Sequence, residues 1–366
     1  MGHKYRWLSN LPILLLMMVG WGCNEPANKE ENLASLSEVA ENYFTVGAAI
    51  SQYQLQNSAS ASLELVQQQY NSITPENLLK WENVHPQPDS FNFEPADQYI
   101  NFGKENEIFI VGHTLVWHSQ TPDWVYEDEQ GQKLSRSALL DRMENHISTV
   151  AGRYQDDIDG WDVVNEVFNE DGSFRESKWY KIIGDDFIRQ AFKYADEAAP
   201  NSELYYNDYN LWKPEKRDAT VKLVKDLQAN DIRIDGVGMQ SHVGLEHPSL
   251  NQIEESILAF SDLGVDVMIS EIDINVSSYV VENELEIGDE LPDSLQQKLA
   301  TRYADLAGLF KKHCDKISRL TFWGVNDGQS WLNYWEDHEI DNHPLLFDRQ
   351  NKPKPAFYSV IETLRN

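Results

Sequence analysis

Gly160-Trp161-Asp162-Val163-Val164-Asn165-Glu166 is a short apolar run that ends abruptly in an amide and a carboxylic acid. Valine is β-branched and favours strands, whereas Asn165 and Glu166 do not, so a buried strand should end here. Residues 265–273 have the same design and deliver Glu271 to a second strand end. Two glutamates at the ends of separate buried strands predict two carboxylates facing one cleft, the minimum equipment for cleaving a glycosidic bond.

The same alternation of short apolar runs and longer amphipathic stretches continues along the chain. We predict strands at residues 44–49, 72–74, 108–113, 160–165, 204–207, 237–240, 267–271 and 320–323. We predict helices at residues 59–70, 95–105, 136–153, 186–197, 214–228, 250–263, 295–314 and 355–364. The acidic segment 276–292 is interpreted as a long loop. This order predicts a single-domain α/β fold, a (β/α)8 TIM barrel. A doubly wound open sheet is the alternative, but no Gly-rich phosphate loop follows the first strand.

Polar or aromatic residues follow nearly every predicted strand, at the end where such barrels carry their chemistry. In chain order these residues are Glu76, Asn77, Lys80, His113, Trp117, Asn165, Glu166, Asn207, Asp208, Tyr209, Gln240, His242, Glu271, Asp273, Trp323, Asn326 and Trp331. Any one of them could be an ordinary core or surface residue. Their convergence on a single mouth indicates an active site.

Glu166 and Glu271 are the predicted catalytic pair. Across a barrel mouth two such carboxylates can lie about 5–5.5 Å apart, the separation of a retaining double displacement. We assign Glu166 as the acid/base, which must carry a proton near neutral pH, and Glu271 as the nucleophile, which must stay ionised. His242, oriented by Asp273, is a candidate hydrogen-bond donor to Glu271. Asn165 is placed to hydrogen-bond a sugar 2-hydroxyl group.

The composition narrows the class of partner. Sixty acidic and 30 basic residues give a net charge of −30, which argues against nucleic acid and anionic membrane surfaces as partners. The eleven tryptophans and sixteen tyrosines must mostly pack in the core, but aromatic faces also suit pyranose rings. The two cysteines form no CxxC motif and the histidines show no HExxH spacing, so we expect no metal site.

The N-terminus predicts export. Residues 1–22 combine a basic start with a short apolar stretch, 11–19, which is too short to span a bilayer. Gly20-Trp21-Gly22-Cys23 resembles a bacterial lipoprotein processing site in which Cys23 is lipidated. A plain secretory signal is the alternative. Residues 23–35 are polar and predict a flexible tether, and residues 36–366 form the predicted catalytic domain.

This N-terminus also sets the expected location. We expect an extracytoplasmic bacterial protein, anchored by lipid at the outer membrane or cell surface, or else secreted. Its membrane contact would be through the N-terminal lipid anchor alone, and we expect a monomer.

Six segments, long and specific, resemble the signature segments of glycoside hydrolase family 10. They are residues 74–82 (TPENLLKWE), 112–120 (GHTLVWHSQ), 161–166 (WDVVNE), 270–273 (SEID), 321–325 (TFWGV) and 354–358 (KPAFY). The similarity runs in order from about residue 36 to residue 364. The resemblance implies a retaining endo-β-1,4-xylanase on a (β/α)8 barrel that acts on xylan and xylo-oligosaccharides without a cofactor.

The resemblance also implies roles for individual residues. Glu166 matches the acid/base of the family and Glu271 its nucleophile. Glu76, Asn77 and Lys80 match groups that hold the sugar on the non-reducing side of the cut. The shell around the cleaved sugar is matched by His113, Trp117, Asn165, Gln240 and His242. Trp323 and Trp331 match an aromatic cover that crowds the C5 position and so favours xylose over glucose.

Two rival functions stay open from the sequence. A related retaining hydrolase on the same barrel could act on β-glucan or mixed-linkage glucan. A glycan-binding lipoprotein that has lost catalysis is a rival from another class, although both glutamates and their surrounding residues are present.

Overall fold

The barrel strands pair in parallel and close into a ring. The pairing order is β6-β5-β4-β3-β2-β1-β9-β8, and β6 also pairs with β8. The strands are β1 (Thr45–Ile50), β2 (Ser72–Pro75), β3 (Phe109–Val116), β4 (Gly160–Asn165), β5 (Glu203–Asp208), β6 (Gly236–Met239), β8 (Asp266–Asn275) and β9 (Ile317–Phe322). The structure, a computed structural model, describes residues 34–366 except 57–60, 286–290 and 336–340. The predicted single-domain (β/α)8 barrel is confirmed.

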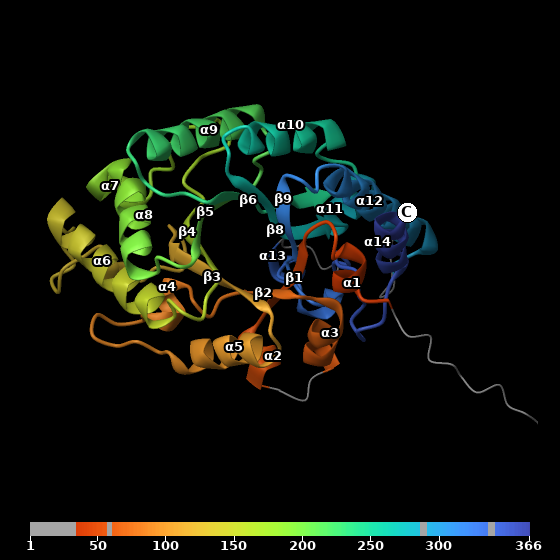
Figure 1. Cartoon of the computed structure of the whole chain (residues 1–366), viewed down its shortest axis with the longest axis horizontal. Helices are drawn as coiled ribbons and strands as arrows, with labels where there is room; N and C mark the ends of the chain where they lie inside the picture. Colours follow the sequence, from red (N-terminus) through yellow and green to blue (C-terminus); the bar gives the residue numbers. More distant parts are fainter. Residues whose placement is uncertain (1–33, 57–60, 286–290, 336–340) are drawn as a thin grey trace, which may run out of the picture. The chain divides into compact units, whose positions relative to one another are not determined.

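A helix follows each barrel strand and packs outside the ring (Figure 1). These helices are α3 (Ala61–Gln69), α5 (Glu94–Glu105), α6 (Arg136–Arg153), α8 (Asp186–Ala198), α9 (Pro214–Ala229), α10 (Leu250–Ser261), α12 (Asp293–Lys312) and α14 (Pro355–Arg365). Proline stands in the first turn of α5, α9 and α14, where its missing N–H has no helical partner to lose. Ser249 closes a capping box with Gln252 at the start of α10.

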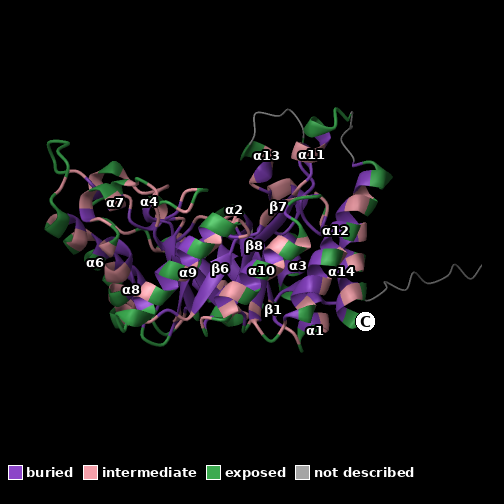
Figure 2. Ribbon diagram, turned by 90° about the horizontal axis from the view of Figure 1, so that it is seen from above, coloured by how far each residue is buried: buried purple, intermediate pink, exposed green. Residues whose placement is uncertain are grey.

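Shorter elements lie at the two ends of the barrel. They are α1 (Leu36–Ala40), α2 (Gln52–Gln56), α4 (Trp81–Val84), α7 (Lys178–Ile183), α11 (Ser277–Glu282), α13 (Leu332–Trp335), the 3-10 turns η1 (Asp123–Val125) and η2 (Asp327–Gln329), and the strand β7 (His242–Gly244). Figure 2 shows α4, α7, α11 and α13 along one edge and α1 along the opposite edge. The long loop predicted at 276–292 was wrong in part, because α11 forms within it.

Two strands continue past their predicted ends. β8 was expected to stop at Glu271 but runs on to Asn275, because Ile272 and Ile274 are buried and β7 pairs with the extension. β3 runs three residues beyond His113 to Val116. Each pairing shifts register near the functional side chain, between Ile269 and Ile272 in β8 and between His113 and Val116 in β3. Glu271 and His113 therefore lie within strands, at places where the strand pairing is irregular, as is common next to active sites.

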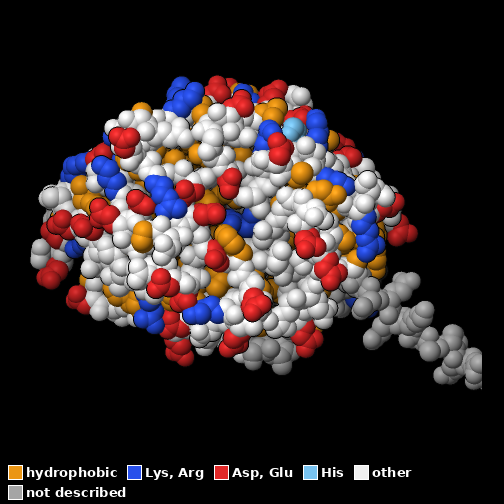
Figure 3. Space-filling view, viewed as in Figure 1, with side chains coloured by type: hydrophobic (Ala, Val, Ile, Leu, Met, Phe, Trp, Pro, Cys, Tyr) orange, Lys and Arg blue, Asp and Glu red, His pale blue; other side chains and the backbone are white. Residues whose placement is uncertain are grey.

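The N-terminal predictions fall outside the described residues. These are the signal peptide 1–22, the lipidation site Cys23 and residues 23–33 of the tether. Within the part of the chain that the structure describes, no helix is both long and apolar enough to cross a membrane. Acidic side chains are scattered over the face drawn in Figure 3 and do not gather in one patch. This spread fits a solvated acidic surface.

Candidate active site

Glu166 stands at the first position after β4. Its backbone lies in the left-handed region, with φ of 58°, which is uncommon for a residue with a side chain. Two hydrogen bonds hold this turn: the backbone N–H of Glu166 donates to the carbonyl of Asn207 at 2.9 Å, and Arg175 Nε donates to the carbonyl of Glu166 at 3.1 Å. The turn directs the carboxyl group into the barrel mouth, where its Oε1 accepts from Gln240 Nε2 at 3.1 Å.

Glu271 is buried and held on both carboxylate oxygens. Asn207 Nδ2 donates to Oε1 at 2.7 Å, and His242 Nε2 lies 3.2 Å from Oε2. The backbone N–H of Glu271 donates to the carbonyl of Gln240 at 3.0 Å, which ties β8 to the end of β6. The side chain therefore has little freedom to leave its place.

His242 is a charged donor at neutral pH. Burial alone would lower the pKa of His242, but the carboxylates of Asp273 and Glu271 outweigh it and raise this pKa to about 10. His242 Nδ1 lies 2.9 Å from Asp273 Oδ1, and Trp331 Nε1 donates to the other oxygen, Asp273 Oδ2, at 2.7 Å. With both ring nitrogens protonated, His242 donates to Asp273 and Glu271 at once.

A chain of buried amides joins the two glutamates. Asn207 Nδ2 donates to Glu271 and also to Asn165 Oδ1 at 3.1 Å. Gln240 Nε2 donates to the same Asn165 oxygen at 3.2 Å and to Glu166. Every amide is at most 3 % exposed, so each is fixed by its partners instead of by water. The relative position of the two carboxyl groups is thus set by side chains from β4, β5 and the end of β6.

A second polar group lies after β2. Lys80 Nζ donates to Asn77 Oδ1 at 3.0 Å and stands 4.8 Å from the ring centre of Trp117. Burial lowers the pKa of Lys80, although the negative charges of Glu271 and Glu76 oppose this shift. Burial raises the pKa of Glu76. Residues 76–80 form a turn between β2 and α4. A compact group of one cation, one acid and one amide results, suited to bind sugar hydroxyls.

Aromatic rings and His113 complete the wall of the mouth. His113 Nδ1 lies 2.8 Å from Asp162 Oδ2, and both side chains are buried. Trp323 packs edge-on against His113, with ring centres 5.3 Å apart, and also against His242 at 6.4 Å. The ring centre of Trp331 lies 5.0 Å from that of His242. These contacts join His113, Trp323 and Trp331 to His242, which itself contacts Glu271.

Tyr209 is braced by two cations. Arg175 Nη2 donates to the Tyr209 hydroxyl at 2.7 Å, and Lys216 Nζ lies 3.4 Å from the Tyr209 ring centre. Lys216 forms a fully buried ion pair with Asp208 at 2.7 Å. Burial raises the pKa of Asp208 to about 6, with Lys216 opposing the rise. Because Arg175 also holds the backbone of Glu166, Tyr209 and Glu166 share one support.

Three supporting residues were not predicted: Asp162, Arg175 and Ser270. Asn207 was predicted to lie at the mouth, after the fifth strand, but no role was assigned to it. Ser270 Oγ donates to Asn207 Oδ1 at 2.6 Å, which orients the amide toward Glu271. A signal for Asn207 exists in Gly238 on the neighbouring strand, where an added Cβ would stand 2.3 Å from Asn207 Oδ1. Glycine at a buried strand position indicates a side chain crossing in front of it.

Among the described residues, no group of three or more His, Cys, Asp or Glu side chains is arranged to hold a metal ion.

Comparison with known proteins gives a consistent result. The family model "Glycosyl hydrolase family 10" matches residues 35–363. Endo-1,4-beta-xylanase A of Xylanibacter ruminicola is 40 % identical over 346 residues, covering 91 % of this chain and 94 % of the relative. Endo-1,4-beta-xylanase of Geobacillus stearothermophilus is 41 % identical over 338 residues, covering 90 % of this chain and 98 % of the relative. A solved structure of a GH10 endoxylanase from a sugarcane soil metagenome superposes with a TM-score of 0.87 at 40 % identity, covering 90 % of this chain and 99 % of the other.

Proposed function

Because the chain belongs to glycosyl hydrolase family 10, we propose that it is an endo-1,4-β-xylanase that cleaves internal linkages of xylan with retention of configuration. The observation that carries this proposal is the joint placement of Glu166 and Glu271 on one buried amide chain in the barrel mouth. Such a chain holds an acid and a nucleophile in a fixed relation, as a double displacement requires.

In the first step, a carboxylate oxygen of Glu271 attacks the anomeric carbon of the xylose to be cleaved. The bond from that carbon to the glycosidic oxygen breaks, and Glu166 gives its proton to the departing oxygen. Asn207 and the charged His242 hold Glu271 in line for the attack. The product is a glycosyl ester on Glu271 and a shortened chain with a free hydroxyl group.

In the second step, a water molecule replaces the departed sugar. Glu166, now a carboxylate, takes a proton from this water while the oxygen bonds to the anomeric carbon and Glu271 leaves. Two inversions restore the starting configuration, and Glu166 regains its proton for the next cycle.

The surrounding side chains select the substrate. Asn165, held by Asn207 and Gln240, presents its Nδ2 to the 2-hydroxyl of the cleaved sugar. Glu76, Asn77 and Lys80 bind the next sugar on the non-reducing side. Trp323 and Trp331 lie against His242 and crowd the position where glucose carries a hydroxymethyl group and xylose carries none. His113, Trp117, Gln240 and Tyr209 complete the binding surface.

Comparing turnover of xylan with turnover of carboxymethylcellulose tests the substrate class. We expect hydrolysis of xylan to internal fragments and much slower release from the cellulose derivative. Preference for the cellulose derivative would favour the β-glucanase alternative. Absence of hydrolysis from both polymers would favour the binding-protein alternative.

We also propose that the protein works outside the cytoplasm as a monomer on a lipid anchor at Cys23. The support is the basic and apolar pattern of residues 1–22 followed by a cysteine, and the origin of every proposed site residue from one chain. Fractionation of bacterial cells expressing the full chain should place the wild type with membranes and a Cys23→Ser variant in the soluble fraction. Light scattering of the soluble variant should give the mass of one chain.

A further inference from the structure

Large aromatic side chains are exposed at a few places in the described part of the chain. They are Tyr53 (67 % exposed), Tyr334 (85 %), Trp335 (66 %) and Tyr358 (54 %). Tyr358 lies on the outer helix α14, whereas Tyr334 and Trp335 lie on α13, which follows β9 at the mouth of the barrel. Exposed tryptophan and tyrosine rings are typical of binding surfaces, because they supply large apolar faces with little side-chain freedom to lose.

Trp335 of α13 continues the wall of the active site. The ring centre of Trp331 lies 5.0 Å from His242, and that of Trp335 lies 4.6 Å from Trp331 at an interplanar angle of 62°. His242 in turn contacts Glu271. An unbroken row of rings therefore leads from the proposed nucleophile to solvent, and Trp335 is its exposed end.

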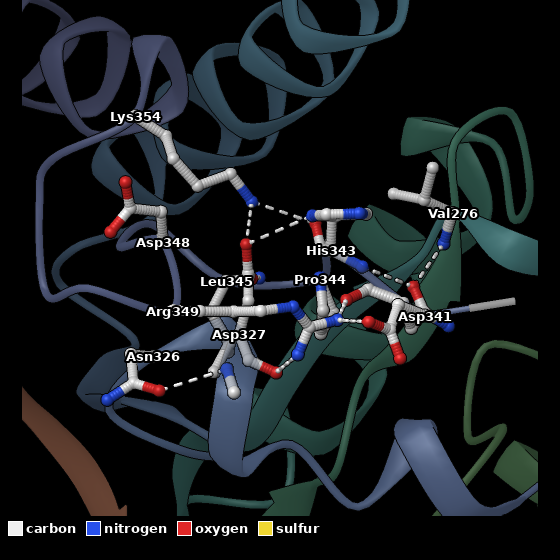
Figure 4. Close-up of polar contacts among 12 residues, drawn as sticks. Val276, Asn326, Asp327, Asp341, His343, Pro344, Leu345, Asp348, Arg349 and Lys354 are labelled. Carbon is white, nitrogen blue, oxygen red and sulfur yellow. Dashed lines mark hydrogen bonds and ion pairs between the residues drawn. The ribbon is translucent and has the colours of Figure 1, made fainter. Parts of the chain in front are cut away.

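A buried polar network fixes α13 in place. Asp327, just before α13, forms an ion pair with Lys354 at 2.8 Å, and their side chains are 0 % and 3 % exposed (Figure 4). Asp327 also accepts from the backbone of Leu345 at 2.8 Å, and Asn333 Nδ2 donates to the carbonyl of Asp327 at 2.8 Å. A surface held this firmly loses little conformational entropy when it binds a ligand.

The position of α13 in the barrel identifies the half of the cleft it serves. β9 pairs with β1, and β1 pairs with β2, which runs into Glu76, Asn77 and Lys80. Gln54 Nε2 of α2 donates to Gln329 Oε1 at 2.6 Å, which ties the loop after β1 to the loop after β9. The loop that carries α13 is therefore tied to the side of the mouth where β1 and β2 lie, and β2 leads into the residues proposed to bind the non-reducing part of the substrate.

We propose that Tyr334 and Trp335 form a further sugar-binding subsite, which stacks on a xylosyl unit of the same xylan chain beyond the unit held by Glu76, Asn77 and Lys80. This inference rests on the proposed function. A neutral sugar polymer is the occupant that fits, because its rings have apolar faces and it meets no repulsion from a chain of net charge −30. The row of rings from His242 through Trp331 to Trp335 gives one sugar chain a continuous surface from the site of cleavage to Trp335.

The test compares a long substrate with a short one. An aryl β-xylobioside occupies only the two sugar positions before the cut, whereas xylohexaose can also reach α13. For each variant, the measured quantity is kcat/KM for xylohexaose divided by kcat/KM for the aryl xylobioside. The double variant Tyr334→Ala/Trp335→Ala should lower this ratio about tenfold, the usual scale for truncating aromatic anchors. Tyr358→Ala, which removes an exposed ring on the outer helix α14, should leave this ratio unchanged.

The outcomes separate the two proposals. An unchanged ratio in the double variant would overturn the subsite, and so would an equal fall with both substrates, which would indicate a structural effect on the reaction centre. Wild-type protein that hydrolyses neither substrate would overturn the proposed function itself. Mapping the cleavage position of end-labelled xylohexaose adds an independent readout: the double variant should cut closer to the non-reducing end than the wild type does.

Discussion

The Nε2 atom of His242 lies 3.2 Å from the Oε2 atom of Glu271. A second carboxylate, Asp273, holds the opposite ring nitrogen at 2.9 Å and is itself bonded by the indole of Trp331. The imidazole is therefore clamped between two negative charges and keeps its own positive charge well above neutral pH. In the proposed reaction, this charge holds the nucleophile in position before and after it is esterified.

The first prediction concerns the titration of His242. Its pKa of about 10 lies above the ordinary value of 6.5, so its ion pairs stabilise the fold fully below about pH 6.5. That stability is lost as the pH rises through about 10. NMR of protein labelled with ¹⁵N-histidine should show His242 protonated up to this pH. In Asp273→Asn the same signal should titrate at distinctly lower pH. The Asp273 carboxylate, which contributes most to raising the pKa of His242, is then absent.

A matched variant controls that titration. Trp331→Phe removes the indole donor to Asp273 but no charge, so His242 should still titrate well above its ordinary range. An imidazole that titrates near pH 6.5 in the wild type would contradict the assignment of a permanent charge.

A second prediction concerns Gly238. In Gly238→Ala the new Cβ would stand 2.3 Å from Asn207 Oδ1 and 3.1 Å from Ser270 Oγ, so the amide that holds Glu271 must move. We expect a loss of about 1–3 kcal/mol in the free energy of unfolding and about a 10²-fold fall in kcat/KM. Urea unfolding and steady-state kinetics give the two numbers.

The control for Gly238 lies in α6. At Gly152 an added Cβ meets only the carbonyl oxygen of Ala198 at 3.8 Å. Gly152→Ala should therefore raise stability by about 0.5–1 kcal/mol, since alanine loses less backbone freedom in a helix, with kinetics unchanged. Full activity in Gly238→Ala would show that Asn207 does not position Glu271.

A third prediction concerns the ion pair below α13. Lys354→Met leaves Asp327 buried without its cation and should lower the free energy of unfolding by about 3–5 kcal/mol. Lys104 pairs with Asp157 at the surface, with exposures of 53 % and 27 %, so Lys104→Met should cost about 0–1 kcal/mol. Thermal unfolding of the two variants in parallel makes the comparison. Equal small losses would mean that the buried pair does not fix the loop.

A fourth prediction separates the two glutamates by leaving group. Glu271→Gln removes the nucleophile and should lower kcat by at least about 10⁴-fold with any substrate. In Glu166→Gln, kcat should fall as far with xylan but much less with a dinitrophenyl xylobioside, because the dinitrophenolate leaving group departs without a proton. The reverse pattern in the two variants would exchange the assigned roles. Circular dichroism of both variants checks that the fold is intact.

The fold could be predicted because the strands and the helices of the barrel have different sequence patterns. Buried parallel strands such as Gly160–Asn165 are short apolar runs, and Pro214 and Pro355 mark helix starts by their fixed φ. The ends of β3 and β8 could not be predicted, because their extensions depend on irregular pairing with neighbours that are distant in sequence. The same holds for β7, which exists only because β8 is long.

The predicted site residues were those at strand ends, where a polar side chain after an apolar run is conspicuous. The structure brings His242, Asp273 and Glu271 into contact. What the sequence did not reveal is the supporting layer: Arg175 lies in an irregular segment, and its bond to the carbonyl of Glu166 depends on the turn at positive φ. Contacts of this kind are made by tertiary geometry and leave no periodic pattern.

Proton NMR of the first product released from an aryl β-xylobioside tests the central claim most directly. Retention through a glycosyl ester on Glu271 predicts that the β-anomer of xylobiose appears first and the α-anomer grows only by later mutarotation. An α-anomer as the first product would mean a single displacement by water and would contradict the assignment of Glu271 as the nucleophile.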